Sequence, residues 1–90
     1  MNETEKQEPE VIDRFFLKAK YRDEILGIYR LVHNEKEQWV RELIWKNGKW
    51  QETDNLIRML IGLDIDLDEV EKGVINQVSP DVDTSPFIMS

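Results

Sequence analysis

Asn47 and Gly48 lie between two tryptophans, and this short stretch constrains the fold more than any other part of the chain. A type I′ turn needs positive φ at both central residues, and Asn and Gly adopt that conformation with the least strain. With these two residues as the loop, the flanking lysines face each other and Trp45 faces Trp50. The tryptophans then form a non-hydrogen-bonded pair, where cross-strand side chains are closest. The sequence therefore predicts a β-hairpin whose register is fixed by an indole pair.

The residues around this hairpin predict a three-stranded antiparallel meander. Strands are expected over 25–32, 38–45 and 49–52, because these stretches are rich in β-branched and aromatic residues. The polar stretch 33–37 is typical of a turn, and His33 is expected to be exposed in it. Along the second strand neither alternating set of residues is polar, so the alternation does not say which face is buried. Three strands with a covering layer make the smallest sheet expected to be stable.

Helical spacing of apolar residues appears on both sides of the meander. A helix is predicted over 10–20, where an apolar face is formed by Val11, Ile12, Phe15, Phe16 and Ala19. A second helix is expected after Thr53, with Gly62 as the C′ residue that follows its end and adopts the left-handed conformation. A third begins at Asp66 with a capping-box variant and ends near Asn76 or Gln77. The order α-β-β-β-α-α indicates an α+β domain whose helices cover one face of the sheet.

The two ends of the chain lack such patterns. Residues 1–9 are predicted to be a disordered acidic tail, because they contain almost no apolar side chains. Residues 78–90 contain two prolines and no helical period, and they are predicted to be a flexible C-terminal tail. A single small α+β domain is thus expected over 10–77. The chain has no cysteine, no secretory signal pattern and no run of about 18 apolar residues, so we expect a cytoplasmic protein.

Charge and motif content argue against several classes of function. The net charge of −7 opposes the usual attraction to nucleic-acid phosphates, although residues 11–50 taken alone are basic. The alternating Asp64, Asp66 and Asp68 are typical of the opening of an EF-hand loop. Glu69 and Ile75, however, stand where that loop needs Gly and Glu. No nucleophile motif accompanies the single histidine, so we expect no enzyme activity, no cofactor and no metal.

Two groups of residues are candidates for an interaction surface. The first is aromatic and contains Trp39, Trp45 and Trp50; the second is basic and contains Arg14, Lys18 and Arg22. Exposed indoles can stack on a ligand or a peptide, whereas packed indoles only stabilise the sheet. A basic row can bind an anion, or it can be the solvated side of a helix. The sequence leaves both alternatives open for each group.

Residues 28–72 contain a spaced pattern of Trp, Gly, Leu and Asp residues, namely Glu42-x-x-Trp45-x-x-Gly48-x-Trp50 followed by Leu56-x-x-x-Leu60-x-Gly62-x-Asp64. This pattern resembles a set of small hypothetical bacterial proteins in which a Trp-turn-Trp hairpin leads into a short helix and a Gly-Asp segment. The resemblance implies a hairpin followed by helices. It implies no activity and no site residues.

The function predicted from the sequence is a small non-enzymatic module for protein–protein interaction or regulation. A sheet covered on only one side leaves apolar surface bare, and such surfaces mark interfaces. We therefore expect a homodimer or a complex with a protein partner that uses the sheet face or an edge strand. One alternative is an acidic mimic of nucleic acid that inhibits a nucleic-acid-binding protein. Another is weak binding of nucleic acid through the basic helix and the hairpin.

Overall fold

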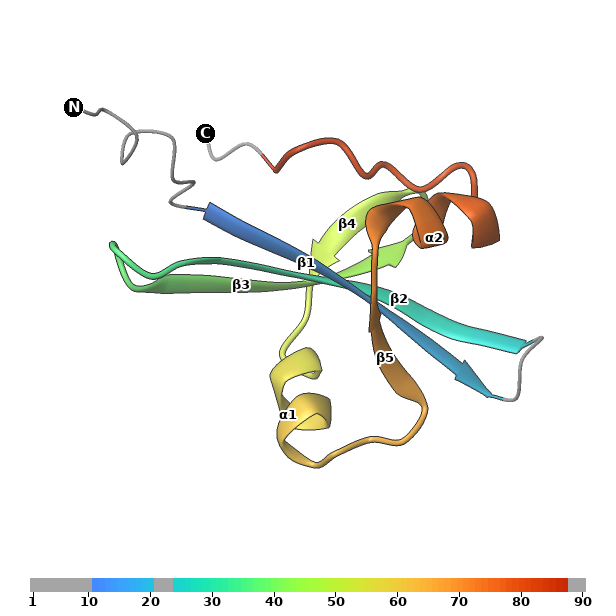
Figure 1. Cartoon of the computed structure of the whole chain (residues 1–90), viewed down its shortest axis with the longest axis horizontal. Helices are drawn as coiled ribbons and strands as arrows, with labels where there is room; N and C mark the ends of the chain where they lie inside the picture. The colour runs from blue at the N-terminus through green and yellow to red at the C-terminus, as the bar shows by residue number, and fades with distance from the viewer. Residues whose placement is uncertain (1–10, 21–23, 88–90) are drawn as a thin grey trace.

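The computed structural model of the chain describes residues 11–20 and 24–87. Its centre is an antiparallel sheet of five strands in the order β4-β3-β2-β1-β5 (Figure 1). The strands are β1 (Val11–Lys20), β2 (Glu24–Asn34), β3 (Trp39–Lys46), β4 (Lys49–Glu52) and β5 (Leu67–Val70), and the helices are α1 (Leu56–Ile61) and α2 (Lys72–Val78). The expected three-stranded meander and the order α-β-β-β-α-α are therefore wrong.

The hairpin built on Asn47 and Gly48 is confirmed. These two residues have φ values of 57° and 77°, as a type I′ turn requires. Trp45 pairs with Trp50, and their rings meet edge to face with centroids 5.2 Å apart and planes at 71°. This is a favourable geometry for two aromatic quadrupoles. The adjoining strands β2, β3 and β4 also lie close to their predicted positions.

The predicted N-terminal helix over 10–20 is wrong, because residues 11–20 form strand β1. Phe15 and Phe16 are neighbours in the chain, and both are almost fully buried, on opposite faces of the sheet. A strand covered on both faces does not alternate apolar with polar, so the period-two signal disappears. The β-branched and aromatic residues of this stretch favour a strand. Pairing with β2 along its whole length then satisfies the backbone groups on one edge of β1.

The third predicted helix, from Asp66 to Gln77, is wrong in its first half. Leu67–Val70 is strand β5, which pairs antiparallel with Phe15–Lys18 of β1. Leu67 packs with the residues around Phe16, whereas Val70 packs with those around Phe15. Only the second half is helical, as α2, and its Ile75 is fully buried.

The two helices lie on opposite faces of the sheet, which Figure 1 shows with α1 below and α2 above. The α1 face is the side on which Leu56 packs against Phe16, Tyr29 and Leu31. The α2 face is the side on which Ile75 packs against Phe15 and Ile28. The sequence predicted cover on one face only, which is wrong. Cover on both faces explains why neither alternating set of β3 is polar.

Residues 79–87 follow α2 and lie along the α2 face. Val82 is buried in the same apolar cluster as Ile75. The indole Nε1 of Trp50 donates a hydrogen bond to the carbonyl of Asp83 at 2.7 Å. The Asn76 amide donates to the carbonyl of Val82 at 3.0 Å. The sequence predicts a flexible tail from residue 78, and these contacts tie its described part to the sheet.

Replacing Trp50 with alanine tests how much the indole pair contributes to stability. Trp50 contacts Trp45 and Phe15 and binds the Asp83 carbonyl, so Trp50→Ala removes packing and a hydrogen bond together. We expect the free energy of unfolding in urea to fall by about 2–4 kcal/mol. Trp39→Ala is the matched control, because Trp39 belongs to neither apolar cluster, and a loss below about 1 kcal/mol is expected there. Equal losses for the two variants would contradict the packed role of the pair.

Candidate interaction surface

The two residue groups predicted from the sequence do not form one surface. Trp45 and Trp50 pack on the α2 face, and each is partly buried. Trp39 begins β3, and its Nε1 donates to the carboxylate of Glu37 at 3.0 Å. Arg14 and Lys18 stand at even positions of β1, which they share with Phe16 of the α1 face. The aromatic pair and the cations therefore point to opposite sides of the sheet.

Both described cations of the basic group are paired with acids. Arg14 makes a bidentate contact with Glu69 of β5, with distances of 3.0 Å from Nε and 2.7 Å from Nη2. The Nζ of Lys18 lies 2.9 Å from the Asp64 carboxylate. Arg22 lies outside the described residues. The pairs leave Arg14 and Lys18 with less attraction for an added anion than free cations would have.

His33 is not the exposed turn residue that the sequence predicts. It lies in strand β2, opposite Ile12 of β1 and Val40 of β3. Its Nε2 is buried and has no hydrogen-bond partner among the described residues. A shallow apolar hollow of about 420 Å³ lies beside it, lined in part by Leu31, Trp39 and Val40.

Arg30 is a buried charged residue that the sequence did not indicate as part of a site. It sits in the middle of β2 with only 2% of its surface exposed, on the α2 face. Its Nε donates to Asp13 at 2.8 Å, and its Nη2 donates to the same carboxylate and to the carbonyl of Ser85. The guanidinium also lies 4.8 Å from the ring centroid of Phe15, and Trp50 and Phe87 pack around it at slightly longer distances.

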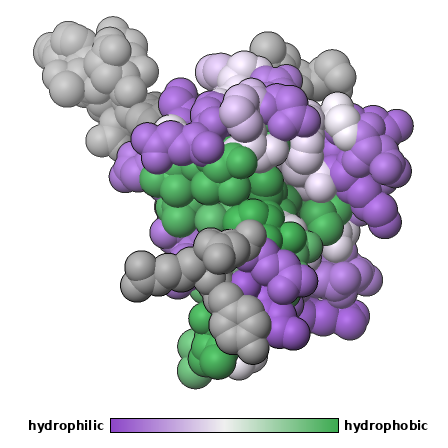
Figure 2. All heavy atoms as spheres, turned by 90° about the vertical axis from the view of Figure 1, so that its right-hand side faces the viewer, coloured by the Kyte–Doolittle hydropathy of each residue, from purple (hydrophilic) through white to green (hydrophobic). Residues whose placement is uncertain are grey.

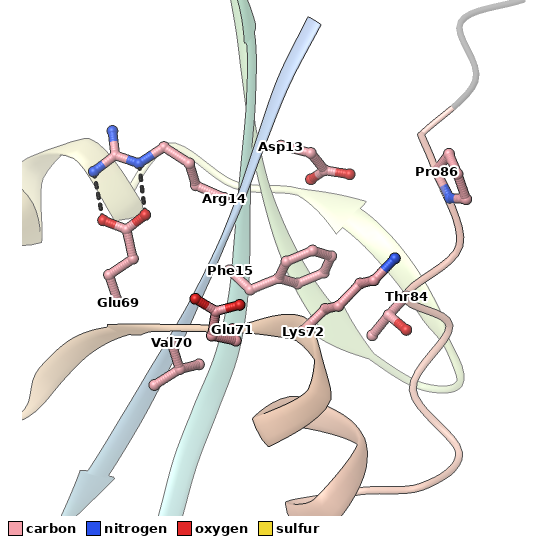
Figure 3. Close-up of a pocket in the computed structure, with 9 residues that line it drawn as sticks. All are labelled: Asp13, Arg14, Phe15, Glu69, Val70, Glu71, Lys72, Thr84 and Pro86. Carbon is pink, nitrogen blue, oxygen red and sulfur yellow. Dashed lines mark hydrogen bonds and ion pairs between the residues drawn. The ribbon is translucent and has the colours of Figure 1, made fainter. Parts of the chain in front are cut away.

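A cavity of about 470 Å³ opens beside these residues, between β1, the end of β5, the start of α2 and the C-terminal segment (Figure 3). The Phe15 ring and Val70 supply apolar wall, and Thr84 and Pro86 line the side formed by residues 79–87. The bidentate Arg14–Glu69 pair lies across β1 from the phenyl ring. The cavity thus combines an apolar wall with a rim of paired charges.

The most exposed apolar residues lie elsewhere, in the aliphatic loop, by which we mean Ile61–Ile65 between α1 and β5. Ile61 is 77% exposed, Leu63 is 81% exposed and Ile65 is 91% exposed. Figure 2 shows hydrophobic side chains at the lower end of the molecule, where Figure 1 places α1 and this loop. Three such residues in five positions form an apolar patch that folding alone does not explain.

The backbone of the aliphatic loop has a defined geometry. Helix α1 ends in a Schellman motif, in which the Leu63 N–H donates to the Leu60 carbonyl at 3.3 Å and the Asp64 N–H donates to the Met59 carbonyl at 3.1 Å. The residue with positive φ in this motif is usually glycine. Here it is Leu63, with φ of 55°, while Gly62 has an ordinary φ of −76°. The sequence predicted the helix end correctly but placed the special position one residue too early.

Asp64 anchors the aliphatic loop to the sheet. Its carboxylate accepts hydrogen bonds from Nζ of Lys18 at 2.9 Å and from the N–H of Asp66 at 2.9 Å. The Ala19 N–H of β1 donates to the Asp66 carbonyl. The hydrogen bond from Lys18, followed by that from the Asp66 backbone, lowers the pKa of Asp64 below its ordinary value. Arg14 lowers the pKa of Glu69 in the same way. The hydrogen bonds of its own turn and the contact with Lys18 therefore join the loop to β1.

Comparison with known proteins gives no further direction. No protein-family model, no curated protein and no solved structure matches the chain. Within residues 11–20 and 24–87, no three acidic or histidine side chains gather as metal ligands would. In the same ranges, no helix has the length and hydrophobicity needed to cross a bilayer.

Replacing Arg30 tests whether it holds residues 79–87 in place. Arg30→Met leaves the Asp13 carboxylate and the Ser85 carbonyl without their donor. Breaking a buried pair costs about 3–5 kcal/mol, and the lower end applies here because the Asp13 side chain is 25% exposed. We expect that loss in urea unfolding. Arg41→Met is the control, because its ion pair with Glu52 is exposed and should change stability by less than about 1 kcal/mol. The double variant Arg30→Met/Asp13→Leu should recover much of the loss, and no recovery would contradict the pairing.

Replacing Lys18 tests the anchor of the aliphatic loop. Because the folded pKa of Asp64 is lowered, the anchor stabilises the fold above the unfolded pKa of about 3.9 and is lost as pH falls through the folded value. In Lys18→Met, we expect carboxyl NMR titration to show a higher pKa for Asp64 than in the unmodified protein. The pKa should stay below its ordinary value, because the Asp66 N–H still donates to the carboxylate. The stability difference from the unmodified protein should be present at pH 7 and should shrink as the pH falls through the folded pKa of Asp64. Lys72→Met, which removes no ion pair within the described ranges, should leave the Asp64 titration unchanged.

Proposed function

We propose that the protein is a non-enzymatic module that binds another protein through the aliphatic loop Ile61–Ile65. The observation that carries the proposal is Leu63. An exposed leucine gains almost no burial energy, yet it occupies a backbone conformation that is strained for a branched side chain by about 1–2 kcal/mol. Such a local conflict is expected where a side chain serves a contact outside its own fold.

The rigidity of the aliphatic loop supports the same function. A loop already fixed by a Schellman motif and by Lys18 loses little conformational freedom when a partner binds. Aliphatic side chains presented in this way fit an apolar groove in the partner. The sequence placed the interface on a bare sheet face or on an edge strand. Because the two helices cover opposite faces, the loop is a better candidate than a bare face.

The alternative functions have less support. Nucleic-acid binding was assigned to a basic row whose described members, Arg14 and Lys18, are each paired with an acid. Mimicry of nucleic acid needs carboxylates that project freely. Several of the carboxylates are engaged instead, among them Asp13, Glu52, Asp64 and Glu69. A homodimer through the aliphatic loop stays an alternative to a different protein partner.

Leu63→Gly separates stability from binding. Glycine relieves the strain at positive φ, so we expect the free energy of unfolding to stay the same or to rise by up to about 1 kcal/mol. The same change removes the central side chain of the patch, so we expect binding to weaken. A photoreactive amino acid at position 65 should form a specific adduct in lysate of the producing cells. Excess unmodified protein should compete for that adduct, and excess Leu63→Gly should not.

The matched control carries the same photoreactive group at position 78, where Val78 is 41% exposed at the end of α2. No competed adduct is expected there. Equal competition by Leu63→Gly and by the unmodified protein would contradict the proposal. Analytical ultracentrifugation of the purified protein distinguishes a homodimer, which would require self-association that Leu63→Gly abolishes.

A further inference from the structure

The cavity beside Phe15 lies where a longer β5 would have continued. Strand β2 pairs with β1 over the whole of its length, whereas β5 pairs only with Phe15–Lys18. After Val70 the chain passes through Glu71 into α2 and leaves the sheet (Figure 1). The first residues of β1, Val11–Arg14, therefore have no partner strand on that side among the described residues.

The edge of β1 that β5 leaves unpaired runs from Val11 to Arg14, and its Asp13–Arg14 end lines the cavity. The Ala19 N–H donates to the Asp66 carbonyl at 3.0 Å, which shows that the odd-numbered residues of β1 direct their N–H and C=O toward β5. This direction alternates strictly along an antiparallel ladder. Val11 and Asp13 consequently direct both of their backbone groups into the space beyond β5. An edge of this kind is a template for an added strand.

The cavity lies on the α2 face, next to the unpaired edge of β1. Figure 3 shows Phe15 and Lys72 on one side of β1, with Thr84 and Pro86 facing them from the C-terminal segment. Arg30 binds the Ser85 carbonyl and so holds that segment over the face. A strand placed about 4.8 Å from β1 would continue the line of β5 along this edge, and its side chains on the α2 face would point toward the cavity.

The charge of the protein favours a segment of another protein over a second copy of this chain. Asp13 is paired with Arg30 and Arg14 with Glu69, and the other two charged residues that line the cavity, Glu71 and Lys72, have opposite signs. The chain as a whole carries −7, which repels a second copy and attracts a cationic partner over long range. A segment with aliphatic residues for the Phe15 and Val70 wall and with flanking basic residues fits both conditions.

We propose that the unpaired edge of β1 beside this cavity receives an extended segment of another protein, aliphatic at its centre and basic at its ends, which pairs antiparallel with Val11–Asp13 as a sixth strand. Residues of the segment opposite Val11 and Asp13 point to the α2 face, beside Phe15 and Pro86. The residue opposite Ile12 points to the α1 face. This surface is separate from the aliphatic loop, so each can fail without the other.

The probe is the labelled peptide acetyl-Lys-Val-Thr-Val-Thr-Val-Lys-amide, titrated into the full chain. Hydrogen exchange measured by NMR should slow at the amides of Val11 and Asp13. It should not change at Ile12, whose N–H is directed to β2. Val11→Pro removes one donor at the first described position of the strand, where proline is tolerated. We expect it to bind the peptide about fivefold more weakly than Val11→Thr, which keeps the N–H.

Two controls keep the result interpretable. Thermal unfolding of Val11→Pro and Val11→Thr shows whether both variants are folded to the same extent. A peptide with proline at its centre should not slow exchange. The proposal is overturned if 1 mM peptide leaves both amides unprotected, or if the two variants bind equally. It is also overturned if concentrating the protein alone protects the same amides, because the occupant is then a second copy.

Discussion

The buried guanidinium of Arg30 is the contact on which the α2 face depends. Taking a cation out of water is costly unless its donors are satisfied, and the planar fork of arginine suits a carboxylate and a carbonyl together. Asp13 supplies the carboxylate from β1 and Ser85 supplies the carbonyl from the C-terminal segment. Aromatic rings from β1, β4 and the C-terminal segment pack around the same group. One side chain thereby joins three distant parts of the chain, and it sets the wall of the cavity beside β1.

A sheet covered on both faces gives this small chain two thin clusters in place of one thick core. The Asn-Gly hairpin was predictable because turn chemistry is local and because two indoles leave only one good register. Strands β2 and β3 were predictable from β-branched and aromatic content alone. Strand β1 was not, because its buried pair Phe15 and Phe16 belongs equally to a helix face and to two faces of a central strand.

The same ambiguity hid β5. Leu67 and Val70 are three positions apart, which places them on one side of a helix but on opposite sides of a strand. Asp66 and Glu69 gave a local signal for a helix start, but pairing with β1 decided the outcome. No pattern within residues 66–70 indicates that they pair with the unoccupied edge of β1. Arg30 was missed for a related reason, since an isolated arginine in an apolar strand gives no sign of a carboxylate seventeen positions earlier in the chain.

The candidate site is where local preference and observed structure disagree most. Gly62 was the expected glycine of the helix end, and the structure gives the left-handed conformation to Leu63 instead. Replacing Leu63 with glycine would satisfy the turn and would remove an exposed side chain from the patch. Stability alone favours that replacement, because nothing within the described chain packs Leu63 well enough to offset its strain. The neighbouring Asp64 anchor holds the loop in this less favourable state. A fold that keeps an exposed leucine in a strained conformation gives up some stability, and this is expected where the side chain contacts another protein.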